Sequence, residues 1–254
     1  MNIHFTISSK YLILNSEEKM DNLKEASNEM LEFLKVLKHS EGVFYQDSYI
    51  YQENSVMDYV YIIQDGLVGF EKINSSGKIL EVELRGKGKF IGVECLLGSS
   101  AKSSANVKAC SKVVVVQAIK IEEIKNTYKD NIDFYKCYSK LLTHYSLNLI
   151  DKISDFALHS KKGALCSVLV RLANTFGIDT TDGKIINIHV TNDQLAELAG
   201  ISTKESTHRI LKSLKDDDII EFKNNLYIIK DIDYLEQSIS IQERRNSNPK
   251  MNML

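Results

Sequence analysis

The chain has 254 residues, of which 43% are hydrophobic and 26% charged, and its formal net charge is -2. This composition is typical of a folded globular protein, and the near-neutral charge excludes a globally basic nucleic-acid coat protein and an acidic tail protein. Apolar runs such as Val113–Val116 are far shorter than the roughly 20 residues that a membrane helix needs. The first residues show no secretion signal, so we expect a cytoplasmic protein that makes no membrane contact.

The cysteines are too far apart to form a recognisable metal site. They are Cys95, Cys110, Cys137 and Cys166, and no CxxC pair occurs. Because metal sites usually take two ligands from one tight turn, we expect reduced thiols and neither a metal ion nor another cofactor. A redox-sensing role for Cys95 or Cys110 stays open.

Residues 1–39 are expected to form an N-terminal extension with one helix, between Glu17 and Lys38. Its apolar residues recur near helical spacing, at Leu23, Met30, Leu31, Leu34 and Leu37.

Residues 40–121 are expected to form an antiparallel β-roll of the jelly-roll kind. Short β-branched and aromatic runs recur about every 8–12 residues, with turn residues between them. Asp65-Gly66 predicts one tight hairpin, because glycine tolerates a positive φ, and Asn74-Ser75-Ser76-Gly77 predicts a second.

Residues 122–160 predict a long helix followed by a hinge. Apolar residues spaced by three or four positions form a seam that suits a second helix, so we expect self-association through this face. Packing of the seam on the chain's own roll is the alternative. The expected dimer interface consists of Tyr138, Leu142, Tyr145, Leu149, Ile153 and Phe156. Ser160-Lys161-Lys162-Gly163 suggests a hinge before the next domain.

Residues 161–235 are expected to form a second, smaller domain, followed by a flexible tail over 236–254. Its expected elements are a helix (164–175), a strand (185–190), two short helices and a hairpin that turns at Lys223-Asn224-Asn225. The overall fold class is therefore α+β.

The most informative segment is TNDQLAELAGISTKESTHRILKSL, residues 191–214. Thr191 and Gln194 form a capping-box pattern, so a helix begins there. Gly200 supplies a tight turn, and Ser202 or Thr203 caps a second helix whose buried face holds Ile210, Leu211 and Leu214. Two short helices, a glycine turn and a following hairpin describe a winged helix-turn-helix.

The exposed face of the second helix favours DNA. Lys204, Arg209, Lys212 and Lys215 outnumber Glu205 over residues 203–215, a local balance of +3. Arginine can donate to guanine in the major groove and lysine can neutralise phosphates. A solvated basic face on a structural helix is the alternative. We expect DNA contacts from Thr191, Ser202, Thr203, Lys204, Glu205, Ser206, His208, Arg209 and Lys212. Asp216-Asp217-Asp218 would repel phosphate and should turn away from the groove.

These motifs, in this order, resemble the cyclic-AMP receptor and fumarate–nitrate regulator (Crp/Fnr) family of bacterial transcription regulators. The resemblance covers about residues 40–233, through YVYIIQDGLVGFEKINSSGKILEVELRGKGKFIG, LL…SSANV, TNDQLAELAG and ESTHRILKSL. It implies a β-roll sensor, a dimerisation helix, a C-terminal winged helix-turn-helix and a homodimer that binds palindromic double-stranded DNA. It further implies RNA polymerase as a partner. Because members of this family are more often activators than repressors, it also implies that the protein activates transcription.

The resemblance also assigns the base-reading residues. The family uses a Glu and, four positions later, an Arg, and Glu205 and Arg209 match this pair. Pairing of the two with each other at i, i+4 is the alternative. The stretch from Gly200 to Glu205 is one residue longer than in the family, which leaves the operator sequence open.

The sensor half departs from the relatives that bind cyclic AMP. They carry a Glu after the Gly of FIG and a later Arg–Ser pair, whereas this chain has Val93 and Ser103-Ser104. Hydroxyls alone would leave a buried phosphate uncompensated, so we expect a different, unidentified small-molecule effector, or none. Glu94 and Lys102 lie one position away from the family's positions. The candidate effector pocket comprises Gly92, Val93, Glu94, Lys102, Ser103 and Ser104.

Other classes of function have less support. His39, His144 and His159 lack the spacing of a heme site, and no Ser/His/Asp set or phosphate loop indicates an enzyme. A ligand-binding module whose winged helix contacts only proteins remains the competing hypothesis, together with a regulator that responds to a cyclic nucleotide.

Overall fold

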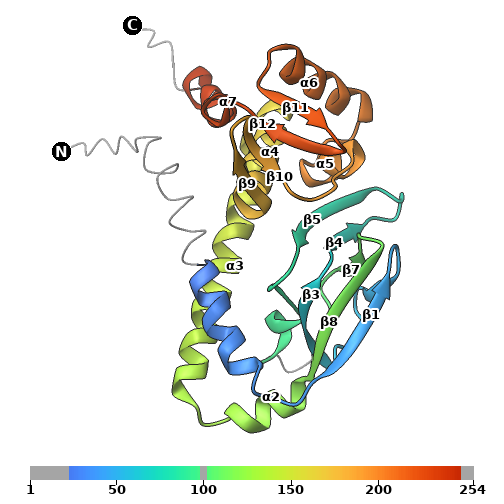
Figure 1. Cartoon of the computed structure of the whole chain (residues 1–254), viewed down its shortest axis with the longest axis vertical. Helices are drawn as coiled ribbons and strands as arrows, with labels where there is room; N and C mark the ends of the chain where they lie inside the picture. The colour runs from blue at the N-terminus through green and yellow to red at the C-terminus, as the bar shows by residue number, and fades with distance from the viewer. Residues whose placement is uncertain (1–22, 98–101, 247–254) are drawn as a thin grey trace, which may run out of the picture. The chain divides into compact units, whose positions relative to one another are not determined.

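The computed structural model describes residues 23–97 and 102–246, with side chains to residue 239. The chain divides into two compact units, one ending at Leu147 and the other starting at Asn148. The first holds the β-roll and the second a smaller helix-rich domain (Figure 1). No helix in the described residues is long and apolar enough to cross a bilayer.

The roll consists of two four-stranded antiparallel sheets, with strand orders β1-β8-β3-β6 and β2-β7-β4-β5. Its strands are β1 (Ser40–Tyr45), β2 (Tyr49–Tyr51), β3 (Tyr59–Asp65), β4 (Val68–Ile73), β5 (Ile79–Arg85), β6 (Phe90–Ile91), β7 (Asn106–Ala109) and β8 (Val113–Lys120). A single turn of 3-10 helix, η1 (Val93–Cys95), follows β6.

One of the two predicted hairpins is correct and the other is wrong. β4 and β5 form a hairpin around Asn74, whose Oδ1 accepts from the backbone nitrogens of Ser76 and Lys78. At Asp65-Gly66 the turn exists, but β3 pairs with β8 and β6 whereas β4 pairs with β5 and β7. The backbone of Leu67 bonds to the β7–β8 connection, so the chain crosses there from one sheet to the other.

Helices close the core of the first unit. The predicted N-terminal helix is described over residues 23–34, and its part before residue 23 lies outside the described residues. Met30 and Leu34 are fully buried in the same cluster as Phe90 of the roll. This helix lies beside the first half of α3 (Ile132–Leu158), where Lys140 forms ion pairs with Glu25 and Glu29 (Figure 1).

The helical region after the roll is interrupted. α2 (Ile121–Tyr128) ends before a short break, and Asn131 then accepts a bond from the nitrogen of Phe134 as α3 begins. The division between the units falls inside α3, although the sequence suggests a hinge at residues 160–163. One reason is Asp155, which is 6% exposed and accepts from Ser167 (2.8 Å) and from Arg171 of α4 (Lys161–Phe176). The last turns of α3 are therefore fastened to the second unit.

The second unit places helices on a four-stranded sheet of order β11-β12-β10-β9. Its further elements are β9 (Gly177–Thr180), β10 (Gly183–Ile186), α5 (Asn192–Leu198), α6 (Lys204–Asp216), β11 (Ile220–Lys223), β12 (Leu226–Ile229) and α7 (Ile232–Asn246). The expected strand over 185–190 is shorter and lies in a β9–β10 hairpin that the sequence analysis missed. Where we expected a flexible tail from residue 236, α7 continues to Asn246 and packs on α4.

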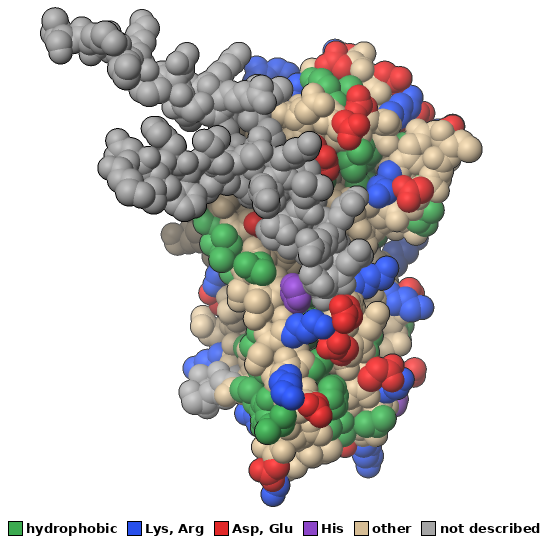
Figure 2. All heavy atoms as spheres, turned by 90° about the vertical axis from the view of Figure 1, so that its left-hand side faces the viewer, with side chains coloured by type: hydrophobic (Ala, Val, Ile, Leu, Met, Phe, Trp, Pro, Cys, Tyr) green, Lys and Arg blue, Asp and Glu red, His purple; other side chains and the backbone are tan. Residues whose placement is uncertain are grey.

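Charges of both signs are interspersed on one face of the molecule. On the face drawn in Figure 2, lysine and arginine side chains alternate with aspartate and glutamate, without a field of one sign. This matches the net charge of -2. A nucleic-acid site on this protein therefore has to be local, rather than a property of the whole surface.

Candidate nucleic-acid interface and sensor site

The first helix of the expected motif begins with a complete capping box. Thr191 Oγ1 accepts from the nitrogen of Gln194 at 3.1 Å, and Gln194 Oε1 accepts from the nitrogen of Thr191 at 3.0 Å. Leu195 and Leu198 are buried. Two otherwise unpaired backbone groups are satisfied in this way, so α5 starts at a fixed place.

Gly200 forms the turn between α5 and α6. Its φ is +65°, in the left-handed region that residues with a Cβ rarely adopt. A Cβ built there would lie 2.9 Å from Cδ1 of Phe156, near the end of α3. The position therefore requires glycine both for its backbone conformation and for its space.

Thr203 is the residue that precedes α6, one of the two candidates that the sequence offered. Its hydroxyl donates to Ser206 Oγ at 2.6 Å and does not cap a backbone nitrogen. Thr207, Leu211 and Leu214 are buried, which fixes the opposite face of α6 toward solvent.

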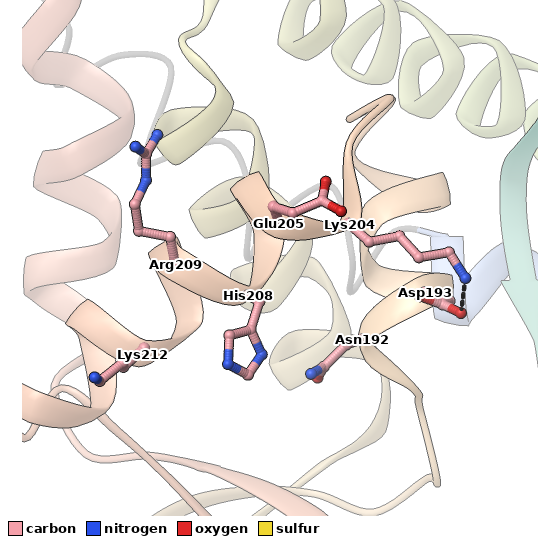
Figure 3. A pocket seen from close by; sticks show the side chains of 7 residues that line it. All are labelled: Asn192, Asp193, Lys204, Glu205, His208, Arg209 and Lys212. Carbon is pink, nitrogen blue, oxygen red and sulfur yellow. Dashed lines mark hydrogen bonds and ion pairs between the residues drawn. The ribbon is translucent and has the colours of Figure 1, made fainter.

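That outer face lines a groove of about 500 Å³ between the start of α5 and α6 (Figure 3). The structure brings five of the expected DNA-contacting residues together there: Lys204, Glu205, His208, Arg209 and Lys212. Thr191, Ser202, Thr203 and Ser206 are not among its lining residues. The groove also includes Asn192 and Asp193, which the sequence analysis missed. Their place directly after the capping Thr191 was the available signal, because side chains in the first turn of α5 lie beside the neighbouring helix.

The charges of the groove are partly paired. Lys204 Nζ lies 2.5 Å from Asp193 Oδ2, and this hydrogen bond raises the pKa of the lysine. Figure 3 shows Lys204 reaching from α6 toward α5, while Arg209 projects in a different direction. No ion pair joins Glu205 to Arg209 among the side chains drawn in the groove. Both remain available for an outside partner.

Asn192 connects the groove to the wing. The hydroxyl of Tyr227, on β12, donates to Asn192 Oδ1 at 2.5 Å. Burial raises the pKa of Tyr227 to about 12, so this hydroxyl keeps its proton at neutral pH. With its oxygen engaged, the Asn192 side chain offers its amide N–H groups as donors.

The wing is a tight hairpin. Asn224 and Asn225 have φ values of +53° and +63°, as a two-residue type I′ turn requires. Before it, Asp218 adopts a φ of +57° and pairs with Lys230 at 2.7 Å. Asp218 is thus turned into the start of the wing.

In the sensor half, the segment after β6 is tightly packed. Gly92 has a φ of +85°, and a Cβ there would lie 2.7 Å from Cε of Met57. Val93 is fully buried. Glu94 is not free to take the place of the glutamate that follows this glycine in the relatives that bind cyclic AMP. Its Oε1 lies 2.5 Å from Nη1 of Arg85.

The second expected part of the effector pocket lies close to this segment. The thiol of Cys95 donates to the carbonyl of Lys102 at 3.4 Å, which places the two stretches side by side. Ser103 is 4% exposed, and its hydroxyl donates to the carbonyl of Ala105 at 2.6 Å. Ser104 is exposed, and its carbonyl accepts from Lys72. The Ser103 hydroxyl is therefore already engaged within its own loop.

Arg85 is a buried cation that the sequence analysis missed. Its guanidinium, 6% exposed, bonds to Glu83 Oε2, Glu94 Oε1 and the carbonyl of Phe90. Burial alone would lower the pKa of Arg85, but Glu83 and Glu94 raise it above its ordinary value. The signal was the pattern of Glu83 and Arg85 at the end of one strand.

The cysteines are free thiols in the described residues. Burial, followed by the charge of Glu81, raises the pKa of Cys110 to about 12, and burial also raises the pKa of Cys95. A reactive sensor cysteine needs a lowered pKa, so these environments oppose a redox role. No cluster of three or more potential metal ligands occurs in the described residues.

The six residues of the expected dimer interface divide into two groups. Tyr138 is 3% exposed and donates to the carbonyl of Val93, and Leu142 and Tyr145 pack against the roll core. Leu149, Ile153 and Phe156 are exposed. The first group thus follows the alternative of packing on the chain's own roll, and only the second leaves apolar surface open.

Comparison with known proteins covers both halves of the chain. Residues 163–238 match the description of a Crp-like helix-turn-helix domain, and residues 41–131 match that of a cyclic nucleotide-binding domain. An anaerobic regulatory protein of Bacillus subtilis is 32% identical to this chain, over a region that covers 77% of this chain and 82% of the Bacillus protein. The listeriolysin regulatory protein of Listeria monocytogenes is 26% identical over 76% of this chain and 82% of its own.

Solved structures share the fold. FixK2 from Bradyrhizobium japonicum superimposes with a TM-score of 0.70 at 16% identity, over 79% of this chain and 97% of that one. CooA from Carboxydothermus hydrogenoformans gives a TM-score of 0.65 at 17% identity, over 78% and 87%. The β-roll, long helix and winged helix-turn-helix are therefore arranged in the same order in these proteins.

Proposed function

Because the chain belongs to the Crp/Fnr family of transcription regulators, we propose that it binds a palindromic operator as a homodimer and is controlled by a small molecule other than cyclic AMP. The groove along α6 carries this proposal. It presents Glu205, His208 and Arg209 on one exposed face. Glutamate can accept from cytosine and arginine can donate to guanine, so this face has the chemistry to read base edges in the major groove.

The open part of α3 supports a dimer. Leu149, Ile153 and Ile150 are exposed to 47%, 56% and 57%, and Leu147 to 37%. Apolar side chains at this spacing along a helix suit a second, parallel copy. We propose that this stretch, with Phe156, is the dimer interface. Two-fold symmetry would then place the α6 helices about one DNA turn apart.

The sensor half supports an effector other than cyclic AMP. The position of the family's phosphate-binding Arg holds Ser103, whose hydroxyl is engaged with Ala105. The nearby cation, Arg85, is already neutralised by two carboxylates. A cyclic phosphate would have to displace Glu94 or Glu83, or lie uncompensated.

The remaining parts of the proposal follow the family. We infer that the protein acts in the cytoplasm and contacts RNA polymerase at its promoters. We also infer that it is an activator, because activators are more common than repressors in this family. We assign it no enzymatic activity.

The test is binding of the full-length protein to fragments of its own genome at fixed salt. A sequence preference over random DNA supports the proposal, and equal binding to all fragments contradicts it. Arg209→Ala should cost about 1–3 kcal/mol on the preferred fragment and relax discrimination at one base pair. Lys112→Ala removes an exposed charge in the β7–β8 connection and serves as the control. If Arg209→Ala leaves binding unchanged, the winged helix is better explained as a protein-contact surface.

A further inference from the structure

We propose that Asp193 withholds Lys204 from DNA and thereby keeps the protein's sequence-independent affinity low. This inference rests on the proposed DNA-binding function and adds a positioning residue to it. Asp193 lies in the first turn of α5 and Lys204 is the first residue of α6, so the pair spans one end of the groove. Their charged atoms are 2.5 Å apart (Figure 3).

The charge of the groove shows what the pair does. Considered alone, residues 203–215 carry a balance of +3. Lys215 does not line the groove, whereas Asp193 does. Within the groove, Lys204, Arg209 and Lys212 therefore face Asp193 and Glu205, which leaves +1. Only Arg209 and Lys212 among its cations have no carboxylate partner within the groove (Figure 3). Counterions condensed on DNA are released when a lysine neutralises a phosphate. A lysine that stays paired with an aspartate neutralises no phosphate and therefore releases none of them.

Stability alone does not explain the pair. The side chains of Lys204 and Asp193 are 75% and 51% exposed, and exposed ion pairs contribute little to folding because solvent screens them. An aspartate in the first turn of α5 also suits the helix dipole, which accounts for its presence but not for its partner. The effect of the contact should therefore appear mainly when a polyanion approaches.

The salt dependence of binding to a random-sequence duplex tests the inference in the full-length protein. Each phosphate neutralised by a lysine contributes about 0.9 to the slope of log K against log salt. Asp193→Asn should free Lys204, steepen this slope by about 0.9 and tighten binding roughly eightfold at 0.1 M salt. Asp182→Asn makes the same charge change in the β9–β10 turn, outside the groove, and should leave the slope unchanged.

Lys204→Gln tests whether Asp193 acts by holding Lys204 away from phosphate or only through its own negative charge. In the wild-type background it should leave the slope unchanged, because Lys204 contacts no phosphate. In the Asp193→Asn background it should return the slope to the wild-type value. Asp193→Glu keeps the carboxylate and should behave as wild type, which separates the pairing from a structural role of the residue.

Two results would overturn the inference. One is a slope that falls by about 0.9 for Lys204→Gln alone, since Lys204 would then contact phosphate despite Asp193. The other is an Asp193→Asn variant that binds random DNA no more tightly than the wild type while unfolding at the same temperature. Both leave the proposed function intact, whereas a wild-type protein without any salt-dependent DNA binding would overturn that function and this inference together.

Discussion

The guanidinium carbon of Arg85 lies 4.5 Å from the ring centre of Tyr145, so the end of β5 is fastened directly to α3. The ring of Phe70 lies on β4, 4.2 Å from the same guanidinium. Because Glu94 also binds Arg85, one buried cation joins two strands, the segment after β6 and the long helix. Within the first unit, a change at the segment around Gly92 can therefore reach α3 through a single side chain.

Arg85→Met should destabilise the first unit. The variant leaves Glu83 and Glu94 without their shared partner, and breaking a buried ion pair from one side costs about 3–5 kcal/mol. Urea unfolding followed by tyrosine fluorescence measures the loss. Lys112→Met, at an exposed site, is the matched control. A loss below about 1 kcal/mol would show that solvent already compensates the two carboxylates.

Unlike Arg85→Met, Tyr145→Phe should not destabilise the first unit. The Tyr145 hydroxyl is buried and makes no hydrogen bond in the described residues, while its ring contacts Arg85. Removing an unsatisfied buried hydroxyl relieves its desolvation penalty, so stability should stay constant or rise by about 1 kcal/mol. Tyr145→Leu, which also removes the ring, should destabilise. The same unfolding experiment compares both variants, and a clear loss for Tyr145→Phe would indicate a hydrogen bond to water.

The thiol of Cys110 should resist alkylation in the folded protein. Burial and Glu81 raise its pKa to about 12, so at pH 8 it is almost entirely protonated, and only the thiolate reacts. In the unfolded chain the pKa returns to its ordinary value and the thiol should react readily. Iodoacetamide labelling at pH 8, with and without urea and read by peptide mass spectrometry, measures the difference. Rapid labelling of Cys110 in the native protein would contradict the raised pKa.

Alanine and glycine at the wing turn should differ in their effect on stability. Asn224 has a φ of +53°, which costs an ordinary residue about 1–2 kcal/mol but costs glycine little. Asn224→Ala should therefore lower the unfolding temperature of the second unit, whereas Asn224→Gly should not. Thermal unfolding of the two variants in parallel makes each the control of the other. Equal losses would point to the asparagine side chain and not to its backbone.

Ile153→Asp should convert the proposed dimer into a monomer. Ile153 is 56% exposed, so in an isolated chain the charge meets solvent, whereas in the interface it would be buried without a partner. Size-exclusion chromatography with light scattering gives the mass directly. Val36→Asp changes an equally apolar residue, 72% exposed and outside α3, and should leave the mass unchanged. A dimeric Ile153→Asp protein would exclude this face from the interface.

The sequence predicts the winged helix-turn-helix well because its signals are local. The capping pattern at Thr191 and Gln194, the glycine turn at Gly200 and the turn at Asn224-Asn225 each depend on neighbouring residues, and all three occur in the structure. The Crp/Fnr family resemblance and the order of β-roll, long helix and winged domain are likewise confirmed.

Features that depend on distant contacts were harder to predict. Whether a turn such as Asp65-Gly66 joins paired strands or leads from one sheet to another depends on β7 and β8, more than 40 residues later. The binding of Arg85 to Glu94 and the pairing of Asp193 with Lys204 likewise require knowing which elements lie side by side. The spacing of apolar residues along α3 is the same around Tyr138 and Ile153, so it does not predict that Tyr138 packs on the roll whereas Ile153 is exposed.

The contact between Gly200 and Phe156 limits how this protein can evolve. No side chain can be added at position 200 without moving the ring of Phe156. A side chain at position 200 would need a smaller or displaced side chain at position 156, and the φ of +65° would still disfavour it. A smaller residue at position 156 needs no change at Gly200. In homologous chains, the turn of the DNA-binding motif should therefore keep its glycine while the residue at position 156 varies among side chains no larger than phenylalanine.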